Sequence, residues 1–86
     1  MDHFIHKDNC LQATFKFSDF KQAFSFMTEV AFHAETQNHH PNWSNVYNTV
    51  EIQLSTHDAG NVVTEKDHEL AESIEVAYEK YSALTS

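Results

Sequence analysis

Three histidines bracket a predicted β-hairpin near the middle of the chain. His39 and His40 precede its first strand, and His57 follows its second strand. Because a hairpin returns the chain to the place where it began, we expect His57 to lie close to the other two histidines. Imidazoles titrate near neutral pH, so two of them beside a carboxylate can supply a general base and a general acid at once. The pattern therefore indicates either an acid–base site at the open end of the hairpin or ordinary loop and strand-end histidines, and the spacing by itself does not name a reaction.

Two carboxylates and a proline complete this candidate site. Glu35 ends the first predicted helix and Asp67 lies in the first turn of the second, so both can approach the histidines. Pro41 disfavours helical backbone at His40 and favours an extended one. Since neighbouring side chains of an extended chain point to opposite faces, His39 and His40 should have different roles. The chain has no Ser-His-Asp order, phosphate-binding glycine loop or nucleotide fingerprint.

Alternating residues predict the strands that position these groups. Apolar and polar residues alternate over residues 11–17, which indicates a half-buried strand, and residues 3–6 ahead of it could form a short partner strand. Residues 43–56 predict a strand, a turn and a second strand, because residues 50–54 alternate in the same way. One face of the resulting sheet should be packed and the other wetter.

Apolar side chains at three- and four-residue spacing predict the first helix. Ser18 is predicted to cap this helix, which runs to about Glu35. Its apolar stripe consists of Phe20, Ala23, Phe24, Met27, Val30, Ala31 and Ala34. Phe26 and Phe32 fall off this stripe and are interpreted either as the edge of the core or as a subunit contact.

The second helix is predicted to open at Thr64-Glu65-Lys66-Asp67, which has the shape of a capping box. Asp67 falls on its inward side, together with Leu70, Ile74, Ala77, Tyr78 and Tyr81. The element order is ββαββα, or βαββα if the first strand does not form. We therefore expect a two-layer α+β fold over residues 1–86, with an antiparallel sheet of three to four strands and two helices packed on one face.

Composition limits the classes of function. The formal charge is −8, from 13 acidic against 5 basic residues, and such a surface disfavours nucleic acids and anionic membranes. No apolar run approaches the roughly 20 residues that a membrane span needs, and residues 1–9 do not resemble a signal peptide. Cys10 is the only cysteine, so no internal disulfide is possible and a reducing, cytoplasmic location is expected. A domain this small has modest stability, which makes a homo-oligomer an expected remedy.

The histidines also belong to a longer pattern. Glu35-x-x-x-His39-His40-Pro41 is followed by Asn45-Val46-Tyr47-Asn48, by Leu54-Ser55-Thr56-His57 and by Thr64-Glu65-Lys66-Asp67. Ahead of it stand Phe15-x-Phe17-x-x-Phe20 and Ala23-Phe24-x-Phe26-Met27. Over about residues 11–81 this pattern resembles the pterin-4a-carbinolamine dehydratases.

The resemblance implies a substrate and an activity. The substrate is 4a-hydroxytetrahydropterin, formed when aromatic amino acid hydroxylases use tetrahydropterin. Its dehydration gives quinonoid dihydropterin and water, and no metal or organic cofactor is implied. By position, His39 and His57 match the family's catalytic histidines, and His40 matches a histidine that helps to bind substrate. Four further positions are implied at the substrate site, namely Glu35, Pro41, Trp43 and Asp67.

The chain departs from the family pattern in two places. Family members usually have a further segment with a Gly-Trp pair ahead of the first strand, whereas this chain begins at Met1. The resemblance implies a dimer or a tetramer, and this departure leaves the choice open. Asn61-Val62-Val63 also makes the loop after His57 one residue longer than expected, so Asp67 is the position most open to displacement.

Two alternatives stand beside the dehydratase. Some family members act as dimerisation cofactors for a transcription factor, so the chain could be a non-catalytic binding module for a protein partner. His39, His40 and His57 could instead bind a metal ion, but the opposed directions expected for the adjacent pair disfavour this.

Overall fold

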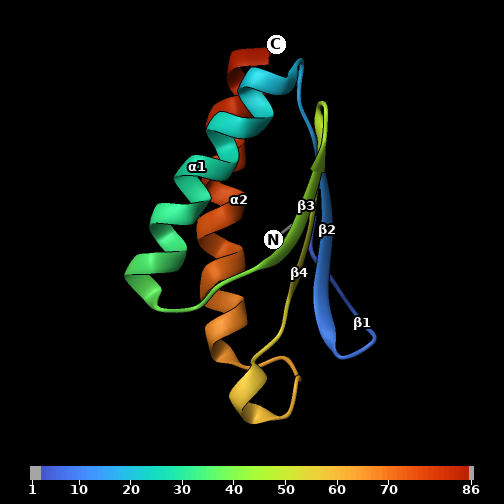
Figure 1. Cartoon of the computed structure of the whole chain (residues 1–86), viewed down its shortest axis with the longest axis vertical. Coiled ribbons are helices and arrows are strands. Elements are labelled where there is room, and N and C mark those ends of the chain that lie inside the picture. The colour runs from blue at the N-terminus through green and yellow to red at the C-terminus, as the bar shows by residue number, and fades with distance from the viewer. Residues whose placement is uncertain (1–2, 86) are drawn as a thin grey trace.

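Residues 3–85, which the computed structural model describes, form an antiparallel sheet with two helices on one of its faces (Figure 1). The elements are β1 (Ile5–Lys7), β2 (Cys10–Lys16), α1 (Phe20–Gln37), β3 (Asn42–Val46), β4 (Thr49–Leu54), the short 3₁₀ helix η1 (His57–Ala59) and α2 (Glu65–Thr85). The four strands lie in the order β1-β2-β4-β3. The predicted ββαββα order and two-layer α+β fold are confirmed, including the short first strand. Neither helix is long and apolar enough to cross a membrane.

Local turn chemistry explains the two hairpins. Asp8 and Asn9 join β1 to β2 with φ angles of 54° and 63°. Two positive φ angles in a two-residue turn define the type I′ turn, whose twist suits a hairpin and which favours Asp and Asn. In the second hairpin, the Asn48 side-chain amide donates to the carbonyl of Phe17 at 3.0 Å, and the Asn48 backbone carbonyl accepts the Phe17 N–H at 2.9 Å. The tip of the β3–β4 hairpin is thereby tied to the end of β2.

The core lies between the sheet and the helices, and Phe15 is at its centre. The Phe15 ring is fully buried, with its centroid 5.3 Å from that of Phe26 and 4.8 Å from that of Tyr78. From the sheet, the inward residues are Leu11, Ala13, Phe15, Phe17, Val50, Ile52 and Leu54. From α2 they are Asp67, Leu70, Ala71, Ile74 and Ala77. The predicted alternation of β2 and β4 and the inward side of α2 are therefore confirmed.

The predicted start and phase of α1 are partly wrong. Asp19, not Ser18, caps the helix, because its carboxylate accepts the Gln22 N–H at 2.9 Å. Phe26 is fully buried, whereas Phe20 and Phe24 are 48% and 54% exposed. The residues that face the core are Ala23, Phe26, Val30 and Ala34. Phe26 is thus a central core residue, neither the edge of the core nor a subunit contact.

A carboxylate on α2 holds the segment ahead of β1. The backbone N–H of His3 donates to Glu75 Oε2 at 2.7 Å, and His3 Nδ1 lies 2.6 Å from Glu75 Oε1. The imidazole ring also packs against Phe15 and Tyr78, at centroid distances of 5.0 and 4.9 Å. These contacts fix the edge of the sheet to the helical layer.

Candidate active site

Asp67 is a buried carboxylate with defined partners. Its side chain has no exposed surface. Its Oδ2 accepts the Thr64 N–H at 2.8 Å and the Thr56 hydroxyl at 2.7 Å, while its Oδ1 lies 2.6 Å from His39 Nε2. The bond to the Thr64 amide is one half of the predicted capping box. The second half is not formed, because the Asp67 N–H donates to the Thr64 backbone carbonyl at 3.1 Å. The Thr64 hydroxyl lies 2.5 Å from that of Thr56.

These contacts keep Asp67 ionised. Burial by itself raises the pKa of this carboxyl, but the bonds from His39, the Thr64 amide and Thr56 outweigh it, so the pKa lies below its ordinary 3.8. At neutral pH the carboxylate therefore carries a negative charge and can only accept hydrogen bonds. It follows that Nε2 of His39 is the nitrogen that carries the proton in this pair.

The end of α1 aims His39 at this carboxylate. Asn38 adopts a left-handed conformation, φ 52°, and its N–H bonds to the carbonyls of Ala34 and Glu35. The His39 N–H then donates to the Ala34 carbonyl at 3.0 Å. Asn tolerates the left-handed conformation better than most residues, which makes it a suitable helix terminator. The imidazole that follows is 10% exposed and lies against the first turn of α2.

His40 and Glu35 form a separate, exposed pair. His40 Nε2 lies 2.7 Å from Glu35 Oε1, and the two side chains are 57% and 78% exposed. A contact this exposed contributes little to stability, because water competes for both side chains. His39 and His40 therefore have different partners, and their different roles stay a prediction.

The loop after β4 is a closed turn that carries His57. The Thr56 N–H donates to the Val62 carbonyl at 2.8 Å, and the Asn61 N–H donates back to the Thr56 carbonyl at 3.0 Å. Within this turn, His57 Nδ1 lies 3.2 Å from Asn61 Oδ1. The turn absorbs the longer loop, and Asp67 nevertheless reaches His39. The expected displacement of Asp67 therefore does not separate it from the histidines.

The three histidines line one pocket of about 280 Å³. Its walls are Asn38, His39, His40, Ser55, Thr56, His57, Asp58 and Lys66. The prediction that His57 lies near the other two histidines is confirmed. Asp67 stands behind His39 and Glu35 bonds to His40, whereas Pro41 and Trp43 are not among the lining residues.

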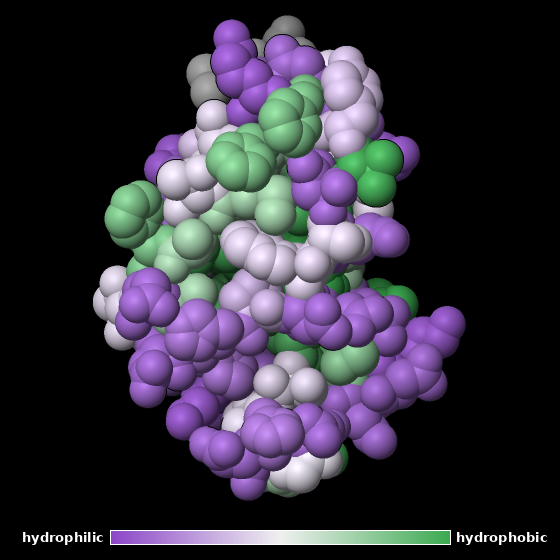
Figure 2. Space-filling view, viewed as in Figure 1, coloured by the Kyte–Doolittle hydropathy of each residue, from purple (hydrophilic) through white to green (hydrophobic). Residues whose placement is uncertain are grey.

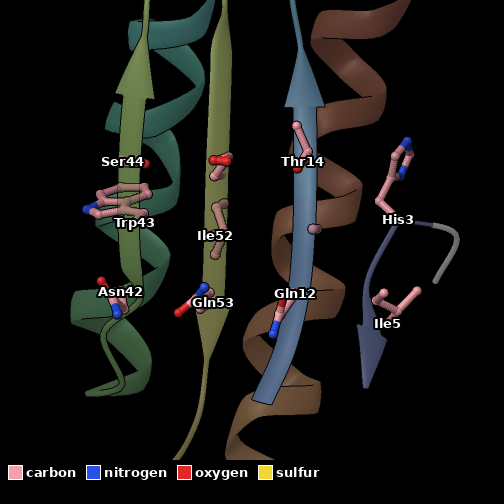
Figure 3. Close-up of a pocket in the computed structure, with 11 residues that line it drawn as sticks. His3, Ile5, Gln12, Thr14, Asn42, Trp43, Ser44, Ile52 and Gln53 are labelled. Carbon is pink, nitrogen blue, oxygen red and sulfur yellow. The ribbon is translucent and has the colours of Figure 1, made fainter. Parts of the chain in front are cut away.

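Trp43 lies elsewhere, on the sheet. It is half-buried against the core and lines a second pocket, of about 530 Å³, that extends across the strands (Figure 3). The other labelled residues of this pocket are His3, Ile5, Gln12, Thr14, Asn42, Ser44, Ile52 and Gln53. Trp43 therefore lines the pocket on the sheet and does not line the histidine pocket, and its place at the substrate site stays a prediction.

Sequence reasoning missed Thr56, Thr64 and Lys66. A signal for Thr56 was present, because it continues the inward positions Val50, Ile52 and Leu54 of β4, where a polar residue needs a partner. Within residues 3–85, no group of three or more His, Cys, Asp or Glu side chains is placed to hold a metal ion. The structure therefore gives the three-histidine metal site no support.

The Asp67 contacts predict how stability depends on pH. Because the folded-state pKa lies below the ordinary 3.8, Asp67 contributes stability that is fully present above that value and is lost as pH falls through the folded-state pKa. We expect Asp67→Asn to cost about 1–3 kcal/mol at pH 7, and less as the pH approaches 2. Urea unfolding across this range measures the difference, with the exposed Asp58→Asn as matched control. A cost for Asp67→Asn that is the same at both ends of the range would contradict the ionised, bonded carboxylate.

Fold and site together define a class of protein, and comparison with known proteins identifies it. The model of the family described as "Pterin 4 alpha carbinolamine dehydratase" matches residues 3–77, and the chain belongs to this family. A Christiangramia forsetii relative, named "Putative pterin-4-alpha-carbinolamine dehydratase", is 53% identical over 74 residues, which are 86% of this chain and 75% of the relative.

Two solved structures resemble the chain. A protein from Brucella melitensis described as a transcriptional coactivator/pterin dehydratase has a TM-score of 0.86 at 39% identity, over 91% of this chain and 84% of that one. A pterin dehydratase-like protein described as a RuBisCO assembly factor in the alpha-carboxysome has a TM-score of 0.71 at 22% identity, over 88% and 87%. The second comparison shows a shared fold.

Proposed function

We propose that this chain dehydrates 4a-hydroxytetrahydropterin to quinonoid dihydropterin and water, with His39 and His57 as the general acid and base. The observation that carries the proposal is the pocket in which His39, backed by the ionised Asp67, lies together with His57 and His40. Membership of the family supports the pterin substrate. The single cysteine supports a reducing, cytoplasmic site of action.

The reaction needs proton transfers that this site can provide. The 4a-hydroxyl is a poor leaving group until it is protonated, and a proton must also leave the ring system. With Nε2 of His39 engaged by Asp67, its Nδ1 is the nitrogen available to substrate; with Nδ1 of His57 near Asn61, its Nε2 is available. Two imidazoles in one pocket can thus give and take a proton near neutral pH.

The remaining residues are proposed to bind substrate. His40 lines the pocket beside His39, and Glu35 orients His40 through its 2.7 Å contact. Lys66 and Asp58 offer a cation and a carboxylate to the polar edge of a pterin. Pro41 is proposed to shape the connection between α1 and β3. Trp43 is proposed to contact substrate from the pocket that it lines on the sheet.

A dehydratase assay tests this proposal. The purified chain is added to a pterin-dependent hydroxylase that generates the carbinolamine, with and without a chelator, and the rate of dehydration is followed. We expect acceleration above the spontaneous rate that the chelator leaves unchanged. A rate equal to the spontaneous one would exclude the dehydratase.

An apolar groove on α1 is a candidate contact surface for a second copy of the chain. Phe20, Phe24 and Phe32 are exposed on α1 and, with Tyr81 of α2, line a groove of about 670 Å³. Figure 2 shows apolar residues gathered over this helical side, away from the hydrophilic end at the β4–α2 loop. We propose that a second copy of the chain covers the groove, because a small domain gains stability by burying such a face.

Removing the groove's aromatic rings tests the homo-oligomer. Phe24→Ser together with Phe32→Ser should lower the mass measured by light scattering after gel filtration to that of one chain. The fold should be retained, because the two side chains are 54% and 71% exposed. Val76→Ser on α2, 58% exposed, serves as the control and should leave the mass unchanged. An unchanged mass for the double variant would show that this groove is not the subunit contact. The non-catalytic binding module would be favoured if the wild-type chain has no dehydratase activity and binds a different protein that the double variant no longer binds.

A further inference from the structure

Thr56 is a buried polar residue two positions beyond the end of β4. It follows Leu54 in the inward alternation of β4, and it is only 7% exposed. A buried hydroxyl costs free energy unless it is hydrogen-bonded, so a valine would suit the position better on packing alone. The contacts of the hydroxyl therefore indicate why a threonine fits here.

Counting protons gives these contacts a direction. The ionised Asp67 has no proton, so the single hydroxyl proton of Thr56 is donated to Asp67 Oδ2 across 2.7 Å. Thr56 must then accept from the Thr64 hydroxyl, 2.5 Å away. The result is a directed chain from the Thr64 hydroxyl to the Thr56 hydroxyl to the carboxylate, in which each bond polarises the next.

These hydrogen bonds leave only one oxygen of the Asp67 carboxylate free to contact His39. Oδ2 is occupied by the Thr56 hydroxyl and by the Thr64 N–H at 2.8 Å. Oδ1 is left for His39 Nε2 at 2.6 Å. A carboxylate held at both oxygens cannot rotate, and it fixes the ring plane and the tautomer of the imidazole that it contacts.

The backbone of Thr56 acts on the other histidine. Its N–H and its carbonyl bond to Val62 and Asn61, which closes the turn that carries His57. One residue thus contacts both halves of the site: the His39 side through its hydroxyl and the His57 side through its peptide groups.

We propose that Thr56 is a positioning residue, whose hydroxyl holds Asp67 so that His39 keeps its proton on Nε2 and offers Nδ1 to the pocket. The kinetic consequence rests on the proposed dehydratase function, whereas the tautomer of His39 does not. The two can therefore fail separately.

Three variants test the role kinetically. Thr56→Val keeps the shape and removes the hydroxyl, Thr56→Ser keeps the hydroxyl, and Thr14→Val makes the same change at an exposed position on β2. We expect Thr56→Val to lower kcat about 10- to 100-fold with little change in KM, because a bond to a charged group is lost while the binding walls remain. Thr56→Ser should restore most of kcat, and Thr14→Val should leave it unchanged. A Thr56→Val enzyme with full kcat, or a loss that Thr56→Ser shares, would overturn the proposal.

Nitrogen NMR of the histidine rings gives a readout that does not depend on activity. At a pH where the imidazoles are neutral, the His39 signals, assigned with His39→Gln, should report a proton on Nε2 in the wild type and a mixture of tautomers in Thr56→Val. Circular dichroism checks that each variant folds. If Thr56→Val does not fold, Thr56→Cys is used in its place, because a thiol is similar in size and only a weak hydrogen-bond donor. An unchanged tautomer in the variant would overturn the positioning role. An inactive wild type with the expected tautomer shift would reject the dehydratase and retain the positioning role.

Discussion

His39→Ala is expected to lower kcat for carbinolamine dehydration on the order of 10²- to 10⁴-fold, the usual contribution of a general acid or base. The structure supports an effect of this size because His39 is the imidazole bonded to the buried carboxylate, at 2.6 Å from Asp67 Oδ1. His57→Ala should have a loss in the same range, since His57 lines the same pocket. Steady-state kinetics of the purified variants, with the hydroxylase-coupled assay, measure both.

Three comparisons sharpen this test. His6→Ala removes an exposed imidazole on β1 and should leave kcat unchanged. The double variant of His39 and His57 should lose less than the product of the single losses, because groups that act as a unit are not additive. Free imidazole in the buffer should restore part of the activity of His39→Ala, since it can replace the missing side chain. Full activity in either single variant would remove that histidine from the acid–base pair.

Phe26→Ala is expected to be the most destabilising of the single changes considered, at about 3–5 kcal/mol. Its ring is fully buried, with centroids 5.3 Å from Phe15 and 4.9 Å from Phe17, so alanine would leave a cavity that β2 and α2 cannot easily fill. A loss of this size is a large share of the stability of a small domain and would leave the variant partly unfolded. Urea or thermal unfolding followed by circular dichroism measures it.

Phe32→Ala is the matched control on the same helix. Phe32 is 71% exposed, so its removal should cost little within one chain. Because it lies in the groove proposed as a subunit contact, both variants are unfolded at several protein concentrations. The cost of Phe26→Ala should persist at every concentration. Equal costs for the two variants would contradict the burial that the structure assigns to α1.

Phe24 and Phe26 show a limit of predicting a buried helix face from the spacing of apolar residues. Apolar residues surround much of α1, so two overlapping stripes, one through Phe24 and one through Phe26, both satisfy helical spacing. Which stripe is buried depends on how α1 packs against α2 and β4, and this is a contact between distant segments. Ser18 and Asp19 show the same limit at the helix start, since both residue types favour the capping position.

The candidate site was likewise only partly predictable from the sequence. Periodicity and chain reversal were enough to predict the hairpin and to bring His57 to His39 and His40, because both are local consequences of strand and turn geometry. They were also enough to place Asp67 on the inward side of α2. They did not assign Asp67 to His39 rather than to His40. That choice follows from the left-handed Asn38 at the end of α1, which turns the chain toward α2.

From the sequence alone, then, the element order, the two-layer fold and the histidine cluster could be predicted. Local periodicity defines the strands and helices, their apolar faces must pack together, and a hairpin brings its two ends close. Only the tertiary structure decided that Phe26 is core, that Thr56 bonds to Asp67, and that Trp43 lines the pocket on the sheet and not the histidine pocket. These depend on which of several chemically suitable partners comes within contact distance. Packing of segments far apart in the chain determines that distance, and side-chain type and spacing do not.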